Sequence, residues 1–189
     1  MQPWIVVLAW CGNVLFLSLA LALFEIFFEK ENGWASAANP RGAGRKLFHG
    51  SLLSEICEKP HLTAYHLFVF ALVLPSILTG ELWLVEAAGT GHHLVMKIGG
   101  VAFVPILFLI AAWFCIFVVE DLLWFLLNWH YPHSVQDLLS GKIWWHTRWL
   151  TLGSIKLPRF YFTTALVAAV FLAASLSPQW LPAAAATAR

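Results

Sequence analysis

The chain has 189 residues, of which 60% are hydrophobic and only 11% are charged, with a formal net charge of +1 and a mean hydropathy of +0.76. A water-soluble domain of this size cannot hide so much apolar surface, so the composition predicts an integral membrane protein. The eleven Lys and Arg residues are scattered, which excludes nucleic acid as a partner, and three cysteines without CxxC spacing imply no disulfide framework.

Four apolar segments are close to the roughly 20 residues that a helix needs to cross a bilayer. They cover residues 5–28, 62–85, 94–129 and 160–176. The first lacks a basic segment before it and a clean cleavage site after it, so we read it as a retained span rather than a signal peptide. The predicted fold is all-α, a single membrane domain over residues 1–189 with four transmembrane helices in a bundle.

The third segment, 94–129, is too long for one straight span. Its 36 residues would measure roughly 54 Å as a helix, so it must tilt, bend near Pro105, or project beyond the lipid. We expect the end from Glu120 to Trp129 to project into the headgroup region.

The charges of the loops predict the orientation. Loops 29–60 and 130–158 carry most of the basic residues, whereas the connection between the second and third segments has one lysine. Because cytoplasmic loops are enriched in Lys and Arg, both long loops should be cytoplasmic and both termini outside.

The last loop has a pattern of its own. Ser134 followed by Asp137 resembles a capping box, and a helix from there would bring Trp145 and Trp149 together. Tryptophan favours the headgroup level of a membrane, so we expect an amphipathic interfacial helix that covers the ends of the spans as a lid.

Ionisable residues from three segments should meet at the cytoplasmic membrane edge. Glu25 ends the first apolar run, His66 lies one turn inside the second, and Glu120 with Asp121 lies near the end of the third. Charged groups at this depth are costly when they face lipid, so we expect them to turn inward and form one cluster. The blander reading is that these acids only mark where helices meet water.

Helical spacing suggests supporting residues for this cluster, because residues four or seven apart share a helix face. The pairs that meet this condition are Glu25 with Glu29, Glu120 with Trp124, and Asp121 with Asn128. Adjacent Glu120 and Asp121 point about 100° apart, so one should contact a ligand directly and the other should support it.

A mixed histidine and carboxylate set is of the kind that holds zinc, iron or manganese. The predicted metal ligands are Glu25, His66, Glu120, Asp121, His130 and His146, with Glu120 and Asp121 also as catalytic candidates. The alternative for His130 and His146 is that they bind no metal, because histidines in loops are more often solvated than ligating. Haem is not favoured, because only His66 lies inside a span.

No familiar catalytic motif narrows the function. The sequence has no HExxH, no GxSxG and no set of histidine boxes. We expect a metal-dependent membrane hydrolase or oxidoreductase that acts on a lipid-like substrate. The alternatives are an ion or proton carrier component and a non-catalytic accessory subunit. The expected partner is membrane lipid, and a lipid-like substrate or a second copy of the chain are further candidates.

Overall fold

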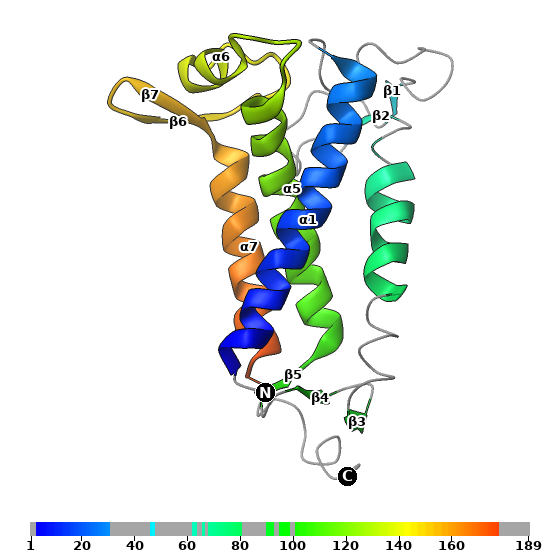
Figure 1. The fold of residues 1–189 in the computed structure, drawn as a ribbon. Coiled ribbons are helices and arrows are strands. Elements are labelled where there is room, and N and C mark those ends of the chain that lie inside the picture. Colours follow the sequence, from blue (N-terminus) through cyan, green and yellow to red (C-terminus); the bar gives the residue numbers. More distant parts are fainter. Residues whose placement is uncertain are drawn as a thin grey trace.

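The computed structural model of the chain describes residues 3–30, 46–47, 62–63, 66, 68–80, 90–92, 95–98 and 101–177. Within these residues the fold is mostly helical (Figure 1). Its helices are α1 (Pro3–Glu29), the π-helix η1 (Val69–Val73) that continues as α-helix to residue 80, α5 (Pro105–Leu127), α6 (Ser134–Ser140) and α7 (Arg159–Ser175).

The prediction of a helical fold is confirmed in part, because short antiparallel strands accompany the helices. The strands are β1 (Lys46–Leu47), β2 (Leu62–Thr63), β3 (Thr90–His92), β4 (Val95–Ile98), β5 (Val101–Phe103), β6 (Trp149–Leu152) and β7 (Ile155–Pro158). They pair as β1–β2, β3–β4–β5 and β6–β7.

Two of the described helices are long and apolar enough to cross a membrane, judged by length and composition. They are Leu8–Phe27 within α1 and Pro105–Leu127, which is α5. The other described apolar helices, Ala71–Gly80 and Arg159–Ser175, are shorter. At 1.5 Å per residue they reach only about 15 and 25 Å, below a hydrocarbon thickness of roughly 30 Å. The described part of the chain therefore does not support four transmembrane helices.

The third predicted span begins later than its apolar run. α5 starts at Pro105 and has 23 residues, and Val104 before it is extended at φ −95° and ψ 105°. Proline suits the first position of a helix because its missing N–H has no partner there, and it biases the preceding residue toward extended backbone. Strands β4 and β5 occupy 95–98 and 101–103 instead. Apolar composition alone does not separate such strands from helix.

Helices α1 and α5 run parallel with a constant register. The hydroxyl of Ser18 donates to the Val14 carbonyl oxygen at 2.7 Å and lies 3.5 Å from the carbonyl oxygen of Ile116. The side-chain amide of Asn128 donates to the carbonyl oxygen of Lys30 at 2.6 Å. The two residues of each interhelical pair are 98 positions apart. Loops 29–60 and 130–158 therefore begin at the same end of the bundle. Which compartment that end faces stays a prediction.

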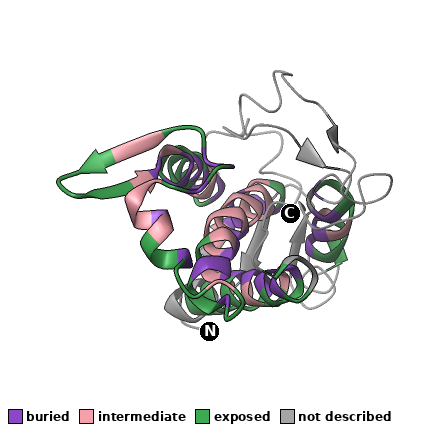
Figure 2. Ribbon diagram, turned by 90° about the horizontal axis from the view of Figure 1, so that it is seen from above, coloured by how far each residue is buried: buried purple, intermediate pink, exposed green. Residues whose placement is uncertain are grey.

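Helix α7 runs antiparallel to α5 and is tied to it at both ends. The backbone N–H of Val104 donates to the carbonyl oxygen of Ser175 at 2.9 Å. The hydroxyl of Ser175 donates in turn to the carbonyl oxygen of Val104 at 2.9 Å. Near the other end, the Tyr161 hydroxyl donates to Asp121. Seen from above, buried residues line the facing sides of the helices, and exposed residues lie on the outer sides (Figure 2).

Residues 128–158 form a cap over the end of the bundle where α5 ends and α7 begins. The elements of the cap are α6 and the β6–β7 hairpin (Figure 1). The predicted amphipathic helix is wrong beyond its first two turns. α6 has seven residues and ends at Gly141, whose φ of 73° turns the chain out of the helix. The predicted capping box is also absent, because the Ser134 hydroxyl donates to the Phe125 carbonyl oxygen at 2.7 Å and Asp137 accepts from Tyr131.

Two apolar clusters hold these elements together. One lies in the body of the bundle and the other beneath the cap. The bundle cluster contains Val14, Leu17, Val69, Leu74, Leu78, Ala112 and Ile116. The cap cluster contains Ala22, Ile26, Trp124, Phe125, Leu138, Ile143 and Trp145. Trp145 is thus part of a protein core, although the sequence predicted an interfacial position for it. The cap cluster joins the C-terminal ends of α1 and α5 to the loop after α6.

Candidate acid–base site beneath the cap

The neighbouring acids near the end of α5 have different surroundings. Glu120 is buried, with 4% of the residue exposed, whereas the Asp121 side chain is 14% exposed. Adjacent helical residues point about 100° apart. Glu120 therefore points with Trp124 toward the cap cluster, whereas Asp121 points toward α7. Trp124 is itself buried, as expected for a residue four positions from Glu120.

One oxygen of Asp121 is the centre of a three-residue network. Oδ2 accepts a hydrogen bond of 2.6 Å from the Tyr161 hydroxyl and lies 3.2 Å from Nε2 of His146. These residues come from three separate parts of the chain, namely α5, the start of α7, and the loop between α6 and β6. We call Asp121, His146 and Tyr161 the Asp–His–Tyr network.

His146 lies in an aromatic enclosure. Its side chain is 1% exposed. The nearest rings have centroids 5.6 to 6.5 Å away and belong to Phe125, Trp145, Trp149, Phe160 and Tyr161. Because these rings exclude water, the charge on Asp121 acts on the imidazole through a low local dielectric.

The register between α1 and α5 places Glu25 at the same depth as the acids of α5. With the offset of 98 residues, Glu25 lies opposite Leu123 and therefore about 4.5 Å along the axis from Glu120. Glu25 is buried, and so is His66, which precedes η1. The helix containing η1 packs on α1 and α5 through Val69 and residues beyond it.

The other predicted site residues have structural or solvent-facing positions. Asn128 uses its amide on Lys30, and its oxygen accepts from the backbone N–H of His130 at 3.0 Å. The side chain of His130 is exposed, as is that of His133. The side chain of Glu29 lies outside the described residues.

The described contacts do not assemble the predicted set of metal ligands. Among the residues that the structure describes, no group of three or more His, Cys, Asp or Glu side chains could hold a metal ion. Two of the predicted ligands, Asp121 and His146, lie in contact at 3.2 Å.

Sequence reasoning missed Tyr161. Its signal is the fragment PRFY, in which a polar aromatic residue stands in the first turn of an otherwise apolar helix. Antiparallel packing of α7 on α5 would have put this position level with Asp121, but that pairing of helices is not readable from one sequence.

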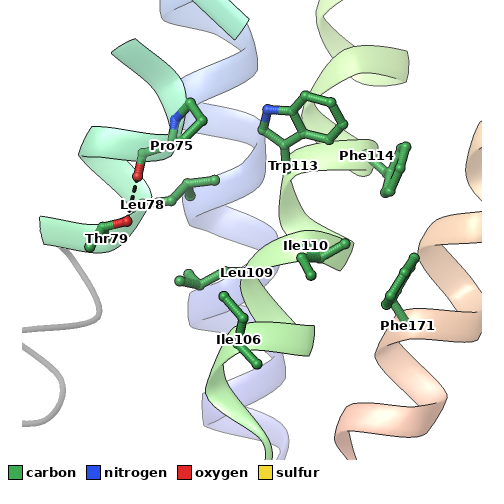
Figure 3. A pocket seen from close by; sticks show the side chains of 9 residues that line it. All are labelled: Pro75, Leu78, Thr79, Ile106, Leu109, Ile110, Trp113, Phe114 and Phe171. Atoms are coloured by element: carbon green, nitrogen blue, oxygen red, sulfur yellow. Dashed lines mark hydrogen bonds between the residues drawn. The ribbon is translucent and has the colours of Figure 1, made fainter. Parts of the chain in front are cut away.

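An apolar pocket of about 440 Å³ lies farther down the bundle, between residues 75–79, α5 and α7 (Figure 3). Its lining residues are Pro75, Leu78, Thr79, Ile106, Leu109, Ile110, Trp113, Phe114 and Phe171. The one hydroxyl among them, on Thr79, donates to the Pro75 carbonyl oxygen at 2.7 Å. The pocket therefore offers an apolar ligand a surface that needs no polar partner.

Comparisons of the chain with protein-family models, with curated proteins and with solved structures gave no match.

Proposed function

We propose that this chain is an integral membrane enzyme that performs general acid–base chemistry on a lipid-like substrate. The single observation that carries the proposal is the Asp–His–Tyr network, in which Asp121 Oδ2 meets both Tyr161 and His146 beneath the cap. A lipid head group would lie at this level if α1 and α5 cross the bilayer.

Membrane embedding is supported by the outward faces of the helices. Only 28% of the apolar window in α1 and 22% of that in α5 is buried within the protein, whereas the core helix of a soluble protein is mostly buried. Large apolar side chains are exposed along α1, α5 and α7, among them Phe16, Phe27, Ile106, Leu126, Leu166 and Val170. Soluble monomers rarely expose continuous apolar surfaces of this extent, and lipid is the environment that suits them.

Asp121 and His146 supply the acid–base chemistry in this proposal. The Asp121 carboxylate, 3.2 Å from Nε2 of the imidazole, stabilises the positive charge that the ring acquires on taking a proton, so the ring can accept and return protons. The hydrogen bond from Tyr161 keeps Asp121 Oδ2 in place for this task. Tyr161 is thus a positioning residue, and His146 is the group proposed to exchange the proton with substrate, which requires the surrounding aromatic rings to move apart because the His146 side chain is 1% exposed.

The pocket suggests why the substrate would be lipid-like. Phe114, in the pocket wall, and Asp121 are seven residues apart on α5, so they lie on one face about 10 Å apart along the helix. Phe114 stacks on Phe171 of α7 at a centroid distance of 6.0 Å, so a molecule with its polar end near Asp121 would reach the pocket along the seam between α5 and α7. The volume of about 440 Å³ is within the usual range for small-molecule sites.

A divalent metal such as zinc, iron or manganese remains the proposed cofactor to test. Carboxylate and imidazole donors suit these ions. The described residues do not supply a full ligand set, so the acid–base roles above are assigned without a metal.

Turnover of lipid by the purified protein tests the proposal. The wild-type protein and the His146→Gln, Asp121→Asn and Tyr161→Phe variants would be incubated in detergent with total membrane lipid extract, and the products followed by mass spectrometry. His133→Gln is the matched control, because that histidine lies on the cap and is exposed.

We expect one lipid class to be consumed by the wild-type protein and by His133→Gln, with a loss of about 100-fold or more in His146→Gln, as general acid–base catalysis contributes roughly 10²- to 10⁴-fold. Tyr161→Phe should lose less. Consumption by every variant at the wild-type rate would refute the catalytic role of the network. No consumption by the folded wild-type protein would instead favour a carrier or accessory role.

A further inference from the structure

The β6–β7 hairpin has two chemically different faces. Paired residues of an antiparallel hairpin share a face, and successive pairs alternate. The register pairs Trp149 with Pro158, Leu150 with Leu157, Thr151 with Lys156, and Leu152 with Ile155. One face therefore carries only aliphatic side chains, and we call this set, Leu150, Leu152, Ile155 and Leu157, the aliphatic face.

The opposite face packs on the cap at its base, whereas Thr151 and Lys156 on the same face are exposed. Gly141, at the end of α6, lies so close to the hairpin that a Cβ there would be 2.6 Å from Cδ of Lys156 and 3.5 Å from Cδ2 of Trp149. Trp149 also packs against the cap cluster. The aliphatic face must therefore point away from α6.

The hairpin lies at the capped end of the bundle. In Figure 1 it extends sideways from the start of α7, at the end of the molecule that carries α6. At the tip, Leu152 is 60% exposed and Ile155 is 44% exposed, so the described residues leave these two side chains largely uncovered.

The charges near the hairpin favour an anionic surface as the partner. Between residues 128 and 160 the chain carries the single acid Asp137, against the bases Lys142, Arg148, Lys156 and Arg159. Asp137 is already paired with Lys142 at 3.7 Å. The backbone N–H of Arg159 donates to the carbonyl oxygen of Arg148 at 3.0 Å, so two arginines flank the base of the hairpin. Basic residues at this level attract anionic lipid head groups.

We propose that the aliphatic face lies in the interface of the bilayer that surrounds α1 and α5, with anionic head groups beside the exposed Arg148. The proposal depends on the membrane embedding proposed above but not on catalysis. Four aliphatic side chains form far less than the roughly 800 Å² per partner of a stable protein interface, whereas side chains of this kind insert readily at a membrane surface. The hairpin is continuous with α7, so it meets the bilayer without any further association step.

The contact would also hold the active-site histidine in place. His146 lies three residues before β6 and faces Asp121 from the loop that leads into the hairpin. A hairpin held by lipid therefore limits how far this loop can lift from α5.

Spin labels on a matched pair of positions test the proposal. Cys11, Cys57 and Cys115 would be replaced by alanine, and a nitroxide would be attached at Leu152→Cys or at Thr151→Cys, its neighbour on the opposite face. A label at Phe16→Cys, on the exposed side of α1, reports membrane embedding itself. Each protein would be placed in nanodiscs of phosphatidylcholine with or without phosphatidylglycerol.

We expect the Leu152 label to collide mainly with oxygen, as the Phe16 label does, and the Thr151 label mainly with a water-soluble nickel chelate. Phosphatidylglycerol should increase the shielding at Leu152, and Arg148→Gln should remove that increase. Equal access of the chelate to positions 151 and 152, with Phe16 still shielded, would overturn the hairpin proposal alone. Access of the chelate to Phe16 would overturn membrane embedding. Shielding of Leu152 that does not respond to phosphatidylglycerol would overturn the role of anionic lipid.

Discussion

The side-chain amide of Asn128 donates a hydrogen bond of 2.6 Å to the backbone carbonyl oxygen of Lys30. Lys30 directly follows α1, and its φ of 54° is a left-handed conformation that costs a lysine roughly 1–2 kcal/mol. The last carbonyl oxygens of a helix have no hydrogen-bond donor within the helix. Asn128, 98 residues away in the sequence, supplies a donor for the carbonyl oxygen of Lys30 at this end. This bond fixes the ends of α1 and α5 at the same level, and with them the depth at which Glu25 and Glu120 lie.

Asn128→Ala should therefore destabilise the protein by about 0.5–1.5 kcal/mol, because it removes the part-buried hydrogen bond to the Lys30 carbonyl oxygen. Thermal unfolding in detergent measures the change. Gln136→Ala, which removes an exposed amide from α6, is the control and should have little effect. Equal effects of the two substitutions would show that the bond to Lys30 contributes nothing to stability.

Gly141→Ala should loosen the cap more than Gly153→Ala. Both glycines have positive φ, so both variants lose roughly 1–2 kcal/mol to left-handed backbone. Only at Gly141 would the new Cβ also meet Lys156, at 2.6 Å, whereas nothing lies within 4 Å at Gly153. Hydrogen exchange of the backbone amides in residues 134–158 should rise further for Gly141→Ala, and adding Lys156→Ala should recover part of the difference. The same exchange in both glycine variants would contradict the close packing of the hairpin on α6.

Tyr131 should titrate at unusually high pH. Its partial burial, followed by its hydrogen bond to Asp137 and the charge of that carboxylate, raises the pKa of the phenol from 10.0 to about 12. A raised folded-state pKa means that the neutral phenol stabilises the fold below about pH 10, and that this contribution is lost as the pH rises toward 12.

The phenolate absorbance of Tyr131 can be isolated as the difference between wild type and Tyr131→Phe. In Asp137→Asn the pKa should fall below its wild-type value, because the negative charge beside the phenol is gone. An unchanged titration in Asp137→Asn would refute the contact of 2.6 Å between the two side chains as the cause.

Elemental analysis of the detergent-purified protein tests the divalent metal. If the cation is present, Glu120→Ala and Asp121→Ala should both lower the metal content, with the direct ligand causing the larger loss and a supporting residue only a 10- to 100-fold loss of affinity. Glu25→Gln and His66→Gln extend the series to the other buried candidates. A wild-type protein without zinc, iron or manganese would remove the metal from the proposal and leave the acid–base roles of Asp121 and His146.

Part of the fold was predictable because hydropathy is a local property. The apolar runs 5–28 and 160–176 correspond closely to α1, Pro3–Glu29, and α7, Arg159–Ser175. The run 94–129 does not correspond to one helix, because strands β4 and β5 share its apolar composition and Pro105 starts the helix. The cap was misread for a related reason. A capping-box pattern at Ser134 and Asp137 is local, but Phe125 and Tyr131 bind these side chains instead.

The sequence by itself determined the apolar character of the chain and the candidates for its chemistry, since Glu25, His66, Glu120, Asp121 and His146 are conspicuous wherever the chain places them. Only the tertiary structure decided which of them meet. Asp121 contacts Tyr161 and His146 because α7 packs antiparallel on α5 and the cap folds back over both helices. Contacts between residues far apart in sequence depend on how whole helices pack, and a nearly uniform apolar surface leaves little trace of that packing in any local pattern.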